Sequence, residues 1–122
     1  MTLQENLIKL DQMKFLKENW NGYGAHPLDL SFIDRVKDLV RGLNIQPFIA
    51  PCPDGSIQIE YEYDKDDINY YLEYELHLDG TMNRFVMPSN LEDGITMNLS
   101  LDQINKDIKD FYEGKVQRLS KP

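Results

Sequence analysis

Apolar residues recur at helical intervals in two segments near the start of the chain. The first stripe consists of Leu3, Leu7, Leu10, Phe15 and Leu16. Together with the capping-box spacing of Thr2 and Glu5, it predicts a helix over about residues 3–18. A second stripe predicts a helix that begins near Ser31 and ends at Asn44. It consists of Ile33, Val36, Leu39, Val40 and Leu43.

The segment between these helices, NWNGYGAHP, predicts an ordered loop. Gly22 and Gly24 permit backbone angles that other residues resist, and Pro27 biases the residue before it towards an extended shape. Large aromatic side chains are mostly buried, so Trp20 and Tyr23 are expected to dock the loop against a sheet, with the Trp20 N–H bound to a carbonyl. The alternative is a ligand groove. Its contact residues would be Trp20, Asn21, Tyr23 and His26.

The period then changes from near 3.6 to 2, which is typical of strands. IQPFIAP predicts a short extended run, and Pro53–Gly55 predicts a turn. Two alternating segments follow, and Asp79–Gly80 predicts a hairpin turn that leads into TMNRFVM. The apolar side of these strands consists of Ile57, Ile59, Tyr61, Tyr63, Tyr70, Leu72, Tyr74, Leu76 and Leu78.

The last part of the chain predicts one more helix. SNLEDGITMNLS shows no clear period and is expected to be irregular, whereas Ser100 followed by Gln103 predicts a helix N-cap. The apolar face of this helix consists of Ile104, Ile108, Phe111 and Tyr112. The predicted fold is therefore α+β, with two N-terminal helices, an antiparallel meander of three or four strands and a C-terminal helix, in a single domain over residues 1–122.

Composition restricts the classes of partner. Asp and Glu outnumber Lys and Arg by 21 to 13, and the formal net charge is −8, so direct binding to nucleic-acid phosphates is not expected. The single cysteine, Cys52, excludes an intrachain disulfide and a multi-cysteine metal site. No apolar run reaches the ~20 residues of a transmembrane helix and no signal-peptide pattern is present, so we expect a cytoplasmic protein without membrane association.

The triplet Glu-Tyr-Glu occurs twice, at residues 60–62 and 73–75. Because alternate residues of paired strands point to the same side, the four glutamates are expected to share one face of the sheet. A four-residue loop over residues 64–67 would set Glu60 opposite Tyr71 and keep the glutamates from facing each other. The following turn would set Arg84 opposite Glu75 and partly neutralise the face.

Three interpretations of this acidic face compete. It could simply be the solvated side of a half-exposed sheet, where charges also deter aggregation. It could bind a basic protein, because carboxylates beside an aromatic side chain provide complementary charge and contact area. Catalysis is less well supported, because it needs carboxylates in different environments. The partner-binding residues would be Glu60, Glu62, Tyr71, Glu73 and Glu75.

No enzyme signature is present in the sequence. His26 and His77 are not spaced as metal ligands, and DKDD over residues 64–67 lacks the spaced ligands of a calcium loop. There is no nucleophile elbow and no phosphate-binding glycine loop, and Cys52 has no base beside it. We therefore expect a protein that is not an enzyme, with no catalytic residues, no metal ligands and no cofactor.

Several motifs carry a resemblance to a protein group. Residues 20–27 read Trp-Asn-Gly-Tyr-Gly-Ala-His-Pro, and Pro53-Asp54-Gly55 and Leu-Glu-Tyr-Glu at residues 72–75 follow. Over roughly residues 15–85 the chain resembles small uncharacterised bacterial proteins with the pattern Trp-(Asp/Asn)-Gly-Tyr-Gly-Ala-x-Pro, then Pro-x-Pro-Asp-Gly-Gly and Leu-Glu-Ile-Glu-Ile. It departs from them at Ser56, where a second glycine is usual, and at Tyr61, where tryptophan is usual. The resemblance implies a bacterial or phage accessory protein of two-gene conflict systems, such as toxin and antitoxin pairs, and no established activity.

The leading hypothesis is a non-catalytic binding module, an antitoxin or an inhibitor, that uses the acidic face against a basic protein. A small carboxylate enzyme that depends on a divalent metal is one alternative. A structural homodimer is the other.

Overall fold

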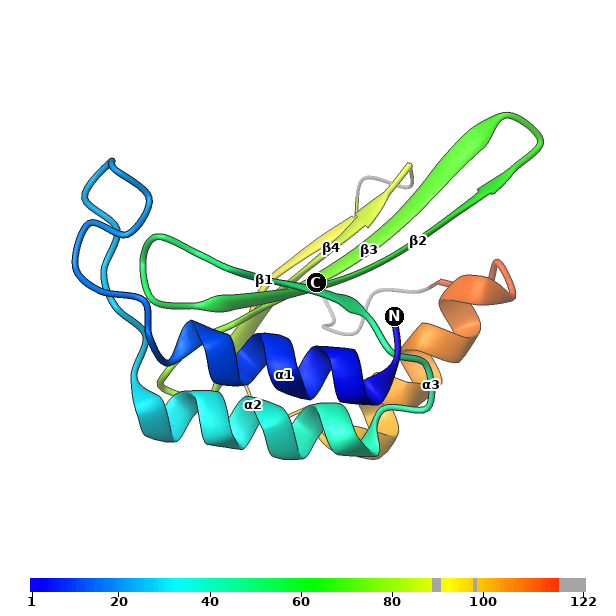
Figure 1. Cartoon of the computed structure of the whole chain (residues 1–122). Helices are drawn as coiled ribbons and strands as arrows, with labels where there is room; N and C mark the ends of the chain where they lie inside the picture. Colours follow the sequence, from blue (N-terminus) through cyan, green and yellow to red (C-terminus); the bar gives the residue numbers. More distant parts are fainter. Residues whose placement is uncertain (89–90, 98, 117–122) are drawn as a thin grey trace.

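A computed structural model of the chain describes residues 1–88, 91–97 and 99–116. In these residues three helices pack on one antiparallel sheet of five strands in sequential order (Figure 1). The elements are α1 (Leu3–Met13), α2 (Leu30–Gly42), β1 (Phe48–Pro51), β2 (Ile57–Lys65), β3 (Ile68–Leu76), β4 (Thr81–Met87), β5 (Leu91–Met97) and α3 (Leu101–Tyr112). The α+β class and the antiparallel meander are confirmed. The strand β5 lies in the segment that was expected to be irregular.

Capping residues set the starts of the helices. α1 begins at the predicted capping box of Thr2 and Glu5 but ends at Met13, five residues earlier than predicted, and the chain then turns. α2 begins one residue before the predicted Ser31, because the Asp29 carboxylate accepts a hydrogen bond of 2.8 Å from the Phe32 N–H. α3 begins at the predicted capping box of Ser100 and Gln103.

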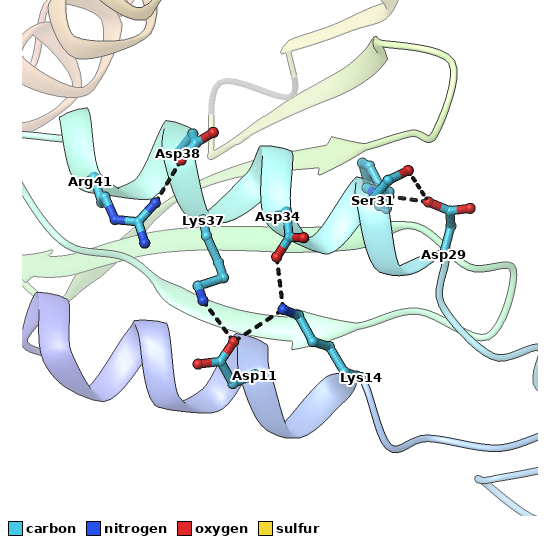
Figure 2. A network of polar contacts seen from close by, with 9 residues as sticks. Asp11, Lys14, Asp29, Ser31, Asp34, Lys37, Asp38 and Arg41 are labelled. Carbon is cyan, nitrogen blue, oxygen red and sulfur yellow. Dashed lines mark hydrogen bonds and ion pairs between the residues drawn. The ribbon is translucent and has the colours of Figure 1, made fainter.

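Ion pairs join α1 to α2 along their exposed sides (Figure 2). The Lys37 Nζ lies 2.7 Å from Asp11 Oδ1, and the Lys14 Nζ lies 2.7 Å from Asp34 Oδ1. Exposed pairs of this kind contribute little stability each, so the helices are held mainly by their apolar faces.

The hydrophobic core lies between one face of the sheet and the three helices. The helices contribute Leu10, Met13, Phe32, Ile33, Val36, Val40, Ile104, Ile108 and Phe111, and the sheet contributes Ile49, Ile57, Ile59, Tyr61, Leu72, Tyr74, Leu76, Met82 and Val86. All three helices cover this same face (Figure 1). No helix of the described residues therefore covers the opposite face of the sheet.

A buried polar group fastens α3 to the sheet. Arg84 and Asp107 form a bidentate pair, with 2.8 Å from Nε to Oδ2 and 2.8 Å from Nη2 to Oδ1, and the Tyr74 hydroxyl also donates to Asp107. The Arg84 side chain has no exposed surface. The predicted pairing of Arg84 with Glu75 was wrong, because Arg84 is set opposite Tyr74 and points into the core.

The turn between β2 and β3 is shorter than predicted. Only Asp66 and Asp67 form it, both with positive φ (53° and 64°), as expected for a two-residue hairpin turn whose twist matches the strands. Glu60 is consequently paired with Glu73, and Tyr71 is paired with Glu62, so the predicted separation of the glutamates was wrong. In the next turn, Leu78 is exposed and was wrongly predicted on the apolar side.

Candidate functional site

The sheet surface opposite the helices carries the glutamates of both Glu-Tyr-Glu triplets. The register pairs Gln58 with Glu75, Glu60 with Glu73 and Glu62 with Tyr71, and cross-strand partners point to the same side. Their neighbours along each strand are buried in the core or, like Tyr63 and Tyr70, partly buried and packed against it, so these six side chains face away from the core. We call this surface the acidic face. It consists of Gln58, Glu60, Glu62, Tyr71, Glu73 and Glu75.

Hydrogen bonds order the centre of the acidic face. The Tyr71 hydroxyl donates to Glu73 Oε1 at 2.7 Å, and the Gln58 amide donates to Glu60 and lies 3.3 Å from the Tyr71 oxygen. Burial and the bond to the Glu73 carboxylate raise the pKa of Tyr71 above its ordinary value, so the phenol stays protonated as a donor at neutral pH. The Tyr71 hydroxyl is thus held close to two carboxylates, those of Glu73 and Glu60.

The acidic face is less neutralised than the sequence predicted. Arg84 points into the core, and the position opposite Glu75 is occupied by Asn83. In β4 the residue paired with Glu73 is Phe85, which is partly exposed, and Met87 beyond it is exposed. On the β1 side, the exposed ring of Phe48 lies opposite Glu60, and the Lys9 Nζ is 3.9 Å from its centroid. The result is a carboxylate surface bordered by apolar side chains.

The loop of residues 18–27 is ordered mainly by its own polar groups. Trp20 Nε1 donates to the His26 carbonyl at 2.8 Å, which is the type of partner that the sequence predicted. Asn21 Oδ1 accepts from the backbone N–H groups of Tyr23 and Ala25, at 2.8 and 3.1 Å. The Tyr23 side chain does not dock, because the residue is 92% exposed. The Asn21 oxygen is therefore engaged within the loop itself, which weakens the ligand-groove interpretation.

His26 connects this loop to the sheet. The backbone N–H of His26 donates to the Pro53 carbonyl at 2.9 Å, and the ring Nδ1 lies 3.2 Å from Glu18 Oε1. The loop therefore ends beside the β1–β2 turn.

A second polar cluster occupies the end of the sheet where the β1–β2 and β3–β4 turns meet. Ser56 Oγ lies 2.6 Å from Asp54 Oδ1 and 3.2 Å from Glu75 Oε1. His77 Nε2 lies 3.1 Å from Asn83 Oδ1 and 4.0 Å from Glu75 Oε1. We call Asp54, Glu75 and His77 the turn cluster.

Nearby groups shift the pKa of Asp54, which belongs to the turn cluster, and the pKa of Cys52, which lies near it. The Ser56 hydroxyl and backbone N–H lower the pKa of Asp54, and the nearby His77 acts in the same direction. Burial raises the pKa of the Cys52 thiol, and the carboxylates of Glu75 and Asp54 add to that rise. Cys52 is therefore a neutral thiol at physiological pH and a poor nucleophile.

The proximity of Asp54 and His77 is not predictable from their spacing, because 23 positions separate them and no ligand spacing links them. A signal was nevertheless available. In an antiparallel meander, the first and third turns lie at the same end of the sheet, and both turns here carry Asp-Gly, at residues 54–55 and 79–80.

Comparisons with protein-family models, with curated proteins and with solved structures found no match to this chain. The resemblance to the Trp-(Asp/Asn)-Gly-Tyr-Gly-Ala-x-Pro proteins therefore stays a prediction. None of the helices in the described residues has the length and apolarity needed to cross a bilayer.

Proposed function

We propose that this protein is a non-catalytic binding module whose acidic face docks a basic protein. The observation that carries the proposal is the position of this face on the side of the sheet that the helices leave uncovered (Figure 1). Four carboxylates lie there together with Tyr71, whose hydroxyl donates to Glu73, and electrostatic complementarity of this kind guides encounter and fixes orientation.

The border of the face supplies contact area. On the β1 side Phe48 is 48% exposed, and on the β4 side Met87 is 38% exposed and Phe85, which is paired with Glu73, is partly exposed. Aromatic side chains and methionine are enriched at protein interfaces, whereas lysine is depleted. A partner with lysine or arginine around an apolar centre would match this arrangement.

In this proposal, the biological role is that of an antitoxin or an inhibitor in a bacterial or phage conflict system. The basic partner would be a nucleic-acid-binding or nuclease-like protein, because proteins that act on phosphates carry basic surfaces. An acidic module that covers such a surface would block access of nucleic acid to it. The module itself needs no catalytic residue for this role.

The test is affinity capture from the native host with two charge-reversal variants. Glu73→Lys changes the centre of the acidic face and puts an opposite charge across from Glu60, so folding should not suffer. Glu113→Lys makes the same change of charge at the C-cap of α3, at a residue that is not part of the acidic face. We expect a basic partner to be lost with Glu73→Lys and retained with Glu113→Lys. Equal retention by both variants, or an acidic partner, would contradict the proposal.

A further inference from the structure

Three side chains of the types that bind transition metals converge in the turn cluster. One donor atom each of Asp54, Glu75 and His77 lies within 4.8 Å of the other two. Asp54 comes from the β1–β2 turn, Glu75 from the end of β3 and His77 from the β3–β4 turn. The meander, and not sequence proximity alone, brings them together.

The charges of this cluster are not balanced by the protein. In the described part of the chain, neither Asp54 nor Glu75 has a lysine or arginine within ion-pair distance, and the basic group near Glu75 is His77. Ser56 lies within hydrogen-bond distance of both carboxylates. Its backbone N–H donates to Asp54 at 3.0 Å, and its hydroxyl carries a single proton that can go to one carboxylate at a time. Ser56 is 3% exposed, so water has little access to this bridging position.

We propose that Asp54, Glu75 and His77 form a binding site for one divalent transition-metal cation, with Zn²⁺ as the type ligand. Zinc takes imidazole nitrogen and carboxylate oxygen at about 2.0–2.2 Å. Mg²⁺ and Ca²⁺ prefer oxygen ligands alone, so the histidine selects against them. The donors need to close by about 1 Å around such an ion. The exposed Asp54 turn and the long Glu75 side chain allow this movement.

The surroundings of His77 match a metal-binding histidine. The Asn83 Oδ1 atom is an acceptor, so the Nε2–H of His77 donates to it, and this contact holds the imidazole ring in one orientation. In this proposal the metal would be bound by the other ring nitrogen, Nδ1, as in metal-bound histidines whose second nitrogen donates to a partner. A cleft of about 550 Å³ opens beside the cluster and is lined by Asp54, Ser56, His77 and Asp79. Three protein ligands leave a coordination position of zinc for water or a ligand from this cleft.

The chain offers matched controls for this site. His26, the other histidine, also lies beside a carboxylate, Glu18, at 3.2 Å, and is exposed. Cys52 is close enough to feel the charges of the cluster but is not one of its three members. His26→Ala and Cys52→Ser therefore test for zinc held elsewhere on the surface.

The experiment is calorimetric titration of the full chain with ZnCl₂ at neutral pH. We expect one site, with affinity at least tenfold weaker in His77→Ala and in Glu75→Gln, and unchanged in His26→Ala and Cys52→Ser. Circular dichroism and thermal melts without metal verify that each variant is folded. Absence of zinc binding at millimolar concentration overturns the proposal. So does binding that survives His77→Ala, or binding that is lost in His26→Ala or Cys52→Ser.

Failure of this site would not affect the proposed docking function. Glu75 belongs to both the acidic face and the turn cluster, so the two experiments are separated by other residues. The zinc titration requires no partner and is decided by His77, which is outside the acidic face. The capture experiment varies Glu73, which is outside the turn cluster.

Discussion

The residue with the largest fully buried side chain in the described chain is an arginine. Arg84 lies in the core with its guanidinium on Asp107, and the Tyr74 hydroxyl donates to the same carboxylate. Removing two charges from water costs several kcal/mol per ion, and the good geometry of such a pair offsets this cost only in part. The pair therefore specifies where α3 docks more than it adds stability.

Truncation of one member of this group should be far more damaging than replacement of the whole group. Asp107→Leu removes the carboxylate from a buried guanidinium, and we expect a loss of about 3–5 kcal/mol in the free energy of unfolding. The combination Arg84→Met, Asp107→Leu and Tyr74→Phe should recover most of that loss. Urea denaturation of both variants measures this. Equal destabilisation of the two would show that the group contributes net stability as a unit.

A second residue-scale prediction concerns the N-cap of α2. The Ser31 hydroxyl and the Phe32 N–H lower the pKa of Asp29 in the folded state. The resulting stabilisation is present above the unfolded pKa, about 3.9, and is lost as the pH falls through the lowered folded value. An asparagine at this position would cap the helix without titrating.

The melting temperature of Asp29→Asn should therefore depend less on pH than that of the wild type. We expect the advantage of the wild type at pH 6 to shrink between about pH 4 and pH 2. Thermal melts across this range provide the measurement. A difference between the two proteins that stays constant with pH would mean that the cap contributes no pH dependence.

At the scale of elements, patterns local in sequence predicted well and pairings between elements did not. The capping boxes of α1 and α3 and the alternation of β2 and β3 depend on neighbouring residues, and the structure has them where they were predicted. The length of α1 was overestimated, because the apolar residues Phe15 and Leu16 keep the helical spacing although the helix has already ended at Met13. β5 was missed, because LEDGITM contains a glycine and does not alternate.

The register of the β2–β3 hairpin shows why the candidate sites were only half predictable. Alternation, with the apolar residues of both strands kept on one side, determined that four glutamates share a face for any loop with an even number of residues. It could not determine which of them are opposite each other, because that depends on turn length. The turn cluster depends on two turns meeting in space, which a list of strands does not show.

The tightness of this hairpin leads to a prediction about its turn. Asp66 and Asp67 both have positive φ, a region that asparagine and glycine occupy at lower cost. Asp66→Asn with Asp67→Gly should raise the free energy of unfolding by about 0.5–1 kcal/mol. Asp67→Val should lower it, because a β-branched residue is strained there. Chemical denaturation of both variants decides whether the two-residue turn sets the register.

At the scale of the whole molecule, most of the ion pairs among the described residues involve a helix, whereas the acidic face lies on the sheet. The pairs that join α1 to α2 occupy their exposed surface (Figure 2). The strand residues of the acidic face bring four carboxylates and no lysine or arginine. A chain of net charge −8 thus concentrates repulsion where it has no helix cover.

The repulsion between these glutamates can be measured, and its effects on stability and binding distinguish a docking surface from a merely solvated one. Glu60 and Glu73 are directly paired, and like charges in that position destabilise a sheet by about 0.2–1 kcal/mol. Glu73→Gln keeps an acceptor for the Tyr71 hydroxyl and removes one charge, so it should stabilise the free protein by that amount. Added salt should stabilise the wild type more than the variant, because screening acts on the same repulsion. Glu113→Gln, which removes an equal charge from the end of α3, is the control for both effects.

Binding gives the decisive comparison, measured on the same variants as the denaturation curves. A residue kept for docking should lower stability and raise affinity, so Glu73→Gln should gain stability and bind the captured partner more weakly, with slower association at low salt. A variant that gains stability and binds as well as the wild type would identify the acidic face as solvated surface.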